Sequence, residues 1–310
     1  TMMMERAREA GAEVREGIKV LDFLEEEGVV VGVTAEDESG KVFEVRASMT
    51  MDATGRDALF QRKKKWRKRD PKLNKIAIWT NYKGAKRDPG VDEGATTVAY
   101  VQGKGWFWNI PLKDDIVSTG IVAERDYLYR DGRDLHAIYQ REIKENKWVE
   151  EHLSEGEQFG EYWVTGEYSY RAENCAADGL LLIGDAFAFL DPVFSSGVYL
   201  ALTTGSLGAD AVADALEAND VSAERFLSYG DRVCKGIEWM RKLVYAFYDE
   251  NFSFKDVAMK YAEIRRDLTD CLIGDLIDKD YGQLFDRVSE FAELPEDLPH
   301  GKTVASSAIT

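Results

Sequence analysis

A strand that runs into a glycine–aspartate pair carries the clearest chemical signal in the chain. Residues 181–198 read LLIGDAFAFLDPVFSSGV. Gly184 lets a ligand approach the backbone closely, and the Asp185 carboxylate can accept hydrogen bonds from sugar-like hydroxyls. Ser195 and Ser196 suit the N-cap of a helix, and Gly197 leaves the first N–H groups of that helix open. Because a helix N-terminus carries a partial positive charge, the segment predicts a site for a ligand with hydroxyl and anionic groups.

Two shorter segments add to this signal. Residues 53–56, Ala53, Thr54, Gly55 and Arg56, end a strand at a glycine, where a ligand could again lie close to the backbone. Residues 106–111 read WFWNIP, which indicates a strand that Pro111 ends. Trp106 and Trp108 are two positions apart and therefore share one face of the strand. Two indoles on one face form a rigid, apolar partition.

The remaining pattern predicts the elements that must position these segments. Residues 2–9 indicate a helix, and alternating residues predict a three-strand meander at 13–23, 29–36 and 42–49. Further strands are predicted at 77–82, 96–102, 105–111, 116–122, 158–168 and 180–183. Helices are predicted at 134–152, 196–218, 223–248, 254–268 and 281–293. We expect the polar tail after Pro295 to be disordered.

Composition bounds the function. The chain has 310 residues, 45% of them hydrophobic, and a net charge of −17, so a globular protein that does not bind nucleic acid is expected. The three cysteines and three histidines are scattered, which argues against a disulfide scaffold or a metal site and favours a reducing, cytoplasmic location. No apolar run reaches the length of a membrane span.

Taken together, the three motifs resemble those of the flavin-dependent halogenases, within the FAD-dependent monooxygenase and halogenase superfamily. The resemblance implies that FAD is the cofactor and that Asp185, after Gly184, holds its ribityl chain. It implies that the helix starting at Gly197 and Val198, after Asp191 and Pro192, points at the pyrimidine edge of the flavin. Ala53, Thr54, Gly55 and Arg56 would pass close to the dinucleotide, and residues 106–111 match the Trp-x-Trp-x-Ile-Pro signature of the family.

The resemblance also implies a reaction. Reduced FAD, oxygen and a halide held near Ser196 and Gly197 would generate hypohalous acid, which crosses the partition of Trp106, Trp108, Ile110 and Pro111 to an organic substrate. A separate flavin reductase is the expected partner, because the chain has no nicotinamide-binding motif. Tryptophan-directed members carry glutamate where this chain has Phe194, which favours a phenolic, pyrrole or acyl-type substrate, in some members tethered to a carrier protein.

Two features depart from the family pattern. The strand–GxGxxG–helix that cradles the FAD pyrophosphate is missing, since Gly103 and Gly105 lead into a strand. The family's catalytic lysine belongs to the same upstream segment, so no residue here takes that role. Because the chain opens at Thr1, inside a predicted helix, we expect a cut N-terminus.

The expected fold is α/β, with an FAD-binding Rossmann-like domain, an inserted β-sheet substrate domain and a helical C-terminal region. The predicted divisions are 1–60 and 161–218 for the two flavin segments, 61–160 for the substrate-side sheet, and 219–310 for the C-terminal helices. Gly55 and Gly184 must then lie near each other, because both have to reach one dinucleotide.

Several alternatives remain open on the sequence. The chain could be a monooxygenase or an isoprenoid-reductase-like enzyme that does not halogenate, or an inactive remnant. The basic run 62–69 suits either a solvated segment or a docking patch for an acidic partner. Five C-terminal aromatic residues suit either a core or a substrate pocket: Tyr199, Trp239, Tyr245, Phe247 and Tyr248.

Overall fold

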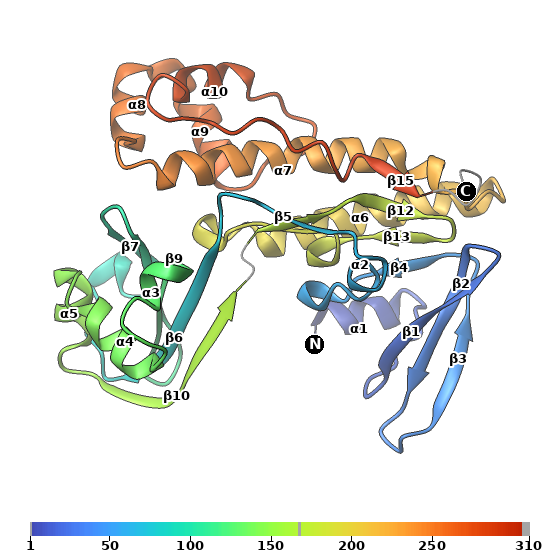
Figure 1. Ribbon diagram of the computed structural model, residues 1–310, viewed down its shortest axis with the longest axis horizontal. Coiled ribbons are helices and arrows are strands. Elements are labelled where there is room, and N and C mark those ends of the chain that lie inside the picture. The colour runs from blue at the N-terminus through green and yellow to red at the C-terminus, as the bar shows by residue number, and fades with distance from the viewer. Residues whose placement is uncertain (1, 167–168, 306–310) are drawn as a thin grey trace.

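The computed structural model describes residues 2–166 and 169–305, which form several sheets beneath a layer of helices (Figure 1). The long helices α6 (Gly197–Glu217) and α7 (Leu227–Tyr248) run across the middle and upper part of the molecule. A five-stranded sheet and a three-stranded meander lie well apart from each other on one side of these helices (Figure 1). Within the described residues, no helix combines the length and apolar character that crossing a bilayer requires.

The meander follows the short helix α1 (Met2–Glu9), which buries none of its side chains. Its strands β1 (Lys19–Glu26), β2 (Val29–Glu36) and β3 (Val42–Arg46) pair antiparallel in chain order. Glu27 and Gly28 both have positive φ, as the tight turn between two twisted strands requires. The predicted middle strand is therefore confirmed, whereas the first strand begins six residues later than predicted, after the positive-φ turn at Gly17.

A mixed sheet lies at the centre of the molecule, with the strand order β15-β12-β13-β4. Its strands are β4 (Thr50–Asp52), β12 (Asn174–Ala177), β13 (Leu180–Leu182) and β15 (Thr303–Ala305). β4 and β13 are parallel, and so are β12 and β15, whereas β12 and β13 form an antiparallel hairpin. Gly208 allows α6 to pack closely on this sheet, because a Cβ there would lie 2.9 Å from the Met51 side chain.

The five-stranded sheet is antiparallel throughout, with the order β10-β6-β9-β8-β7. Its strands are β6 (Lys75–Lys83), β7 (Thr97–Val101), β8 (Gly105–Pro111), β9 (Ile116–Glu124) and β10 (Glu157–Gly166). One face buries Phe107 and Ile121 beneath the helices α3 (Arg125–Leu128), α4 (Leu135–Ile143) and α5 (Lys147–Leu153), and Tyr139 of α4 packs in the same cluster. The opposite face, which carries Trp106, packs against α7 through Val244.

A small sheet of β14 (Ala188–Phe189), β11 (Tyr170–Ala172) and β5 (Arg67–Arg69) joins segments that are far apart in the sequence. The helix α2 (Leu59–Lys64) leads into β5. The basic run is therefore split between a helix end and a strand. Lys63 and Lys64 pair with Glu25, and Lys68 pairs with Glu173, so the chain's own carboxylates neutralise part of this charge.

The C-terminal region adds α8 (Phe254–Lys260), α9 (Arg265–Leu272) and α10 (Gly282–Val288) above α7 (Figure 1). The predicted helix 254–268 was wrong as one element, because a 3-10 turn at Ala262–Ile264 separates α8 from α9. The predicted helix 134–152 is likewise two helices, since the Asn146 side chain accepts from the N–H of Val149 and starts α5 anew.

The disorder expected for the tail after Pro295 was wrong for its described part. Thr303–Ala305 forms β15 at the edge of the mixed sheet, and the N–H of Gly301 donates a 2.7 Å hydrogen bond to the carbonyl of Glu173. Residues 306–310 lie outside the described residues, as does the end of the predicted strand 158–168 beyond Gly166.

Candidate functional site

The two predicted glycine motifs meet at one edge of the mixed sheet. β4 and β13 are parallel neighbours, with Asp52 opposite Leu182, so both chains leave the sheet at the same end. The three residues of β13 are fully buried, as expected of a short strand covered on both faces. The 3-10 turns Gly55–Asp57 and Gly184–Ala186, which follow these strands, contact each other. The expected proximity of Gly55 and Gly184 is therefore what the structure has.

Both glycines take backbone conformations that other residues rarely adopt. Gly55 has φ +63° and Gly184 has φ +54°. A Cβ built on Gly55 meets no atom within 4 Å, so the space beside this turn is open. The N–H of Gly184 donates a 2.9 Å hydrogen bond to the Thr204 hydroxyl of α6, which anchors the second turn to the helix.

Asp52 organises the first turn, although sequence reasoning did not select it. Its buried carboxylate accepts hydrogen bonds from the N–H and hydroxyl of Thr54, at 2.9 and 2.7 Å, and from the N–H of Phe60 at 3.0 Å. The Thr54 hydroxyl in turn accepts from the N–H of Leu59. An acidic residue two positions before a threonine at a strand end is the signal that could have found it, because aspartate often bonds the backbone two residues ahead.

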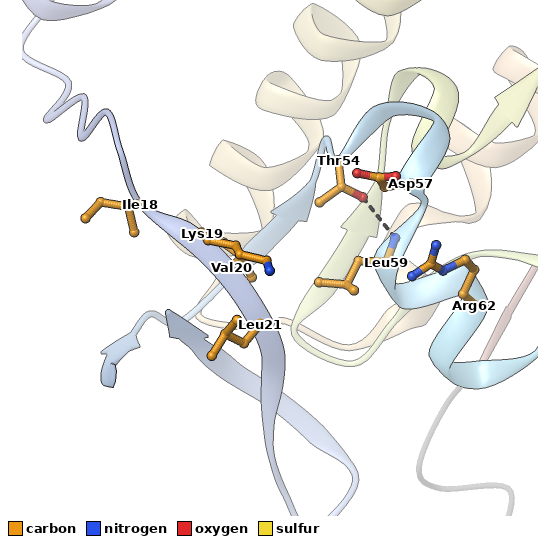
Figure 2. A pocket seen from close by; sticks show the side chains of 8 residues that line it. All are labelled: Ile18, Lys19, Val20, Leu21, Thr54, Asp57, Leu59 and Arg62. Atoms are coloured by element: carbon orange, nitrogen blue, oxygen red, sulfur yellow. Dashed lines mark hydrogen bonds between the residues drawn. The ribbon is translucent and has the colours of Figure 1, made fainter. Parts of the chain in front are cut away.

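A cavity of about 600 Å³ opens beside Thr54. Residues 18–21, at the start of β1, line one side, and Asp57, Leu59 and Arg62 line the other (Figure 2). Figure 2 shows the Thr54 hydroxyl bonded to Leu59 at the rim of this space. The lining contains the cations Lys19 and Arg62 beside apolar carbon, which suits a ligand with both apolar and anionic parts.

Asp185, in the middle of the second turn, is half-buried. Burial raises the pKa of Asp185, and the nearby Arg56 guanidinium partly opposes that shift. Arg56 itself donates to the carbonyl of Gly166 at 2.5 Å and lies 4.8 Å from the ring centre of Phe189. No hydrogen bond from the described part of the chain reaches the Asp185 carboxylate, so its oxygens are available to a ligand.

The loop before α6 is shaped by Asp191 and Pro192. The buried Asp191 carboxylate accepts a 3.1 Å hydrogen bond from the N–H of Val193 and caps a 3-10 turn that begins at Pro192. Burial raises the pKa of Asp191 to about 6, although the Tyr248 hydroxyl donates to its Oδ2 at 2.8 Å. Ser195 follows in the left-handed conformation, with φ +54°.

The start of α6 is less capped than predicted. Ser196 occupies the N-cap, as expected, and is 7% exposed, but its side chain makes no capping hydrogen bond. Gly197 and Val198, in the first turn, are exposed. The first N–H groups of α6 are therefore not satisfied by an N-cap side chain, and they carry the positive end of a 21-residue helix.

The tryptophans of β8 belong to a larger aromatic surface. We call the side chains of Trp106, Trp108, Trp79 and Trp163 the tryptophan face. Consecutive ring centres along this series are 6.1, 6.2 and 6.0 Å apart. Trp79 and Trp163 were not predicted, because only the pairing of β6, β9 and β10 brings them into register with β8.

The tryptophan face borders the loop that precedes α6. Trp106 is 3% exposed and packs in one cluster with Val193 of that loop and Val244 of α7. Trp108 is half-buried, as are Ile110 and Pro111 at the end of β8. The structure thus places Trp106 of the predicted partition against the loop that leads into α6.

The C-terminal aromatic residues mostly serve as core. Tyr245, Phe247 and Tyr248 pack against the cluster around Trp106. Trp239 stacks on Phe285, with ring centres 5.3 Å apart. The Tyr199 ring lies so close to Gly274 that a Cβ built there would be 3.3 Å from its Cδ1 atom.

Known proteins match this chain over most of its length. The family model described as tryptophan halogenase matches residues 1–257. A 1H-pyrrole-2-carbonyl-peptidyl-carrier-protein chlorinase from Pseudomonas fluorescens is 26% identical, over 96% of this chain and 67% of that protein. The corresponding brominase from Pseudoalteromonas luteoviolacea is 32% identical, over 74% of this chain and 57% of that protein. The chain thus spans about two thirds of the first of these relatives and little more than half of the second.

Solved structures agree in fold. The flavin-dependent brominase Bmp2 superimposes with a TM-score of 0.84 at 27% identity, covering 94% of this chain and 73% of that one. The chondrochloren halogenase CndH gives a TM-score of 0.73 at 25% identity, covering 98% and 74%. The predicted mixed α/β architecture and the resemblance to flavin-dependent halogenases are both confirmed.

Proposed function

The chain belongs to the tryptophan halogenase family, and from this membership we propose that it halogenates an organic substrate with reduced FAD, oxygen and halide. One observation supports the proposal most directly. The turns after β4 and β13, the start of α6 and the tryptophan face converge on one region of the molecule. A flavin enzyme needs these parts together, because cofactor, halide and partition must act on one another.

The residues at the shared strand edge fit FAD. A dinucleotide needs open space beside a glycine and a carboxylate for its hydroxyls, and Gly55 and Asp185 offer these. We assign cofactor binding to Ala53, Thr54, Gly55, Arg56, Gly184, Asp185, Asp191, Pro192, Gly197 and Val198. We assign the cavity beside Thr54 to a further part of the same dinucleotide. When bound, FAD supplies the redox chemistry that activates oxygen.

The chain's own residues would bind the cofactor and the halide, orient them, and exclude water. Asp185 would accept from ribityl hydroxyls, and the N–H groups that begin α6 would bind the anionic edge of the reduced flavin and the halide. The halide site proposed at Ser196 and Gly197 uses the positive end of the helix, with Gly197 leaving room for the ion. Trp106, Trp108, Ile110 and Pro111 exclude water and keep the organic substrate away from the cofactor.

The substrate we propose is a pyrrole-type acyl group on a carrier protein. Two relatives carry such substrates in their names, and Phe194 stands where tryptophan-directed members have glutamate. A separate flavin reductase is the proposed second partner. The cytoplasmic location stays a prediction, with which the three buried free cysteines are consistent. The division into 1–60, 61–160, 161–218 and 219–310 likewise stays a prediction.

The test uses protein produced from its complete gene, with reduced FAD, oxygen and chloride or bromide. A pyrrole-2-carbonyl carrier protein and a panel of free phenols are offered separately, and products are identified by mass spectrometry. Halogenated carrier-bound pyrrole supports the proposal. Hydroxylated product without halogen would favour the monooxygenase alternative, and failure to bind FAD would favour the remnant.

A further inference from the structure

The hydroxyl group of Tyr248 links Trp106 of the partition to the Asp191–Ser196 loop, which precedes α6. Tyr248 is the last residue of α7 and lies between β8 and the loop before α6. The indole N–H of Trp106 donates a 2.8 Å hydrogen bond to its hydroxyl oxygen. The same hydroxyl donates a 2.8 Å hydrogen bond to Oδ2 of Asp191. Trp106 and Asp191 come from segments 85 positions apart, and α7 supplies the group between them.

The direction of both bonds follows from the donor inventory. An indole nitrogen can only donate, so the tyrosine oxygen must accept from Trp106. Its single proton is then left for the Asp191 carboxylate. Burial and the neighbouring carboxylate hold the pKa of Tyr248 well above its usual value, so the phenol keeps that proton at neutral pH.

The charged groups around Tyr248 reinforce this placement. The Lys75 ammonium lies 4.1 Å from the centre of the Tyr248 ring and pairs with Glu124 at 2.5 Å. Lys75 is 7% exposed, and its charge also acts on Asp191. The phenol is thus held on its ring face by a cation, at its oxygen by an indole and at its proton by a carboxylate, which leaves it little freedom to rotate.

We propose that Tyr248 is a positioning residue that fixes the Trp106 indole relative to the Asp191–Ser196 loop. Ordinary core packing would require only the ring, and a phenylalanine would supply that. A buried hydroxyl that satisfies two partners in two site segments is instead a specific link. The inference rests on the proposed function, because it makes α7 responsible for the alignment of partition and flavin loop.

The test begins with Tyr248→Phe and needs no cofactor. Indole N–H groups are observed by NMR on nitrogen-15-labelled protein, with the Trp106 signal assigned from Trp106→Phe. We expect the Trp106 N–H to exchange with solvent about tenfold faster in Tyr248→Phe. The Trp108 N–H, which donates to the Ser118 hydroxyl, is an internal control that should not change.

Asp191 gives a second readout on the same variant. Loss of the hydrogen bond from Tyr248 should raise the proton affinity of the Asp191 carboxylate about tenfold or more. A pH titration of the carboxyl carbon-13 signal measures this change. Asp191→Asn assigns the signal. Among the described residues, Tyr248 and Lys75 are the ionisable groups that act on Asp191, and Lys75, with its partner Glu124, is retained in the variant.

Tyr245→Phe is the matched control. Tyr245 lies on the same helix and in the same cluster, but its hydroxyl bonds Asp70. It should leave the Trp106 exchange rate and the Asp191 titration as in the parent protein. With reduced FAD, halide and substrate supplied, Tyr248→Phe should give less halogenated product per flavin oxidised, and Tyr245→Phe should match the parent.

The outcomes separate the two proposals. If the Trp106 exchange rate and the Asp191 titration are unchanged in folded Tyr248→Phe, the link does not exist and the inference is overturned. If both change but the product yield per flavin does not, Tyr248 has no positioning role in the reaction, which also overturns it. If the parent protein halogenates nothing, the proposed function fails, while the first two measurements still decide whether Tyr248 joins Trp106 to Asp191.

Discussion

The backbone N–H of Ile183 donates a 3.1 Å hydrogen bond to the carbonyl of Asp52. This bond extends the parallel pairing of β4 and β13 by one residue, up to the point where both chains turn. It therefore sets the distance between the two glycine turns. A ligand that contacts both turns is held by one continuous piece of sheet rather than by two independent loops.

Asp185→Ala should weaken FAD binding about tenfold or more. A carboxylate that accepts from a ligand hydroxyl contributes about 1.5–3 kcal/mol, and the variant removes that acceptor. Fluorescence titration of flavin measures the effect. Asp210→Ala is the matched control, because Asp210 is an exposed carboxylate on α6 away from the turns. Equal flavin affinity in the two variants would remove Asp185 from the site.

Asp191 should make the protein less stable as the pH rises from 4 to 7. Its carboxyl titrates near pH 6 when folded and near 3.8 when unfolded, so the folded state binds the proton more tightly. The protonated carboxyl therefore adds about 3 kcal/mol to the free energy of unfolding below pH 3.8, and this contribution is lost as the pH rises through 6. Denaturant unfolding of Asp191→Asn should lack this decline, whereas the exposed control Asp210→Asn should keep it. Parallel pH profiles for parent and Asp191→Asn would contradict the assignment.

His300 should make the protein less stable as the pH falls, which is the opposite of the effect of Asp191. Burial, with Arg171 and Lys68 nearby, lowers the pKa of His300 to about 4 from 6.5. The unfolded chain therefore takes up the proton first, and stability falls as the pH drops from 6.5 to 4. His300→Gln should lose less stability over that range than the parent in the same unfolding experiment. A variant that is as acid-sensitive as the parent would show that another group carries the effect.

Gly120→Ala should destabilise the tryptophan face by about 1–3 kcal/mol. A Cβ at Gly120 would lie 2.4 Å from Cζ2 of Trp108 and 2.5 Å from Cβ of Trp79, so these side chains must move. Gly205→Ala is the control, because its Cβ meets nothing within 4 Å and alanine favours a helix by about 0.5–1 kcal/mol. Unfolding midpoints of the two variants should shift in opposite directions. Equal midpoints would mean that the indoles can give way without cost.

Thinning the partition should divert the reaction. Trp106→Phe and Trp108→Phe keep an aromatic wall but shorten it, whereas alanine would cost about 3–5 kcal/mol of stability. We expect less halogenated product per flavin oxidised, with more hydrogen peroxide or hydroxylated product. Product mass spectrometry and a peroxide assay measure both. If both folded variants keep the parent's halogenation yield, the two tryptophans are ordinary core.

Local sequence was sufficient for the parts of the site that depend on local physics. The apolar residues of β13, the turn at Gly184 and the proline after Asp191 each define their own backbone within a few residues. The spacing of Trp106 and Trp108 likewise places both on one face of a strand, because side chains alternate along it. The motifs and the family resemblance therefore follow from the order of the residues alone.

Tertiary structure alone decided how these parts meet. Trp79 and Trp163 join the tryptophan face only through strand register, and Gly120 matters only because two indoles pass over it. The bonds from Asp52 to Thr54 are local, but only the folded chain shows that the same carboxylate also accepts from the N–H of Phe60 at the start of α2. Tyr248 was one of several aromatic residues at helical spacing, and nothing local distinguishes it from Tyr245. Contacts between residues distant in the sequence depend on the packing of whole elements, which the pattern of any single element does not contain.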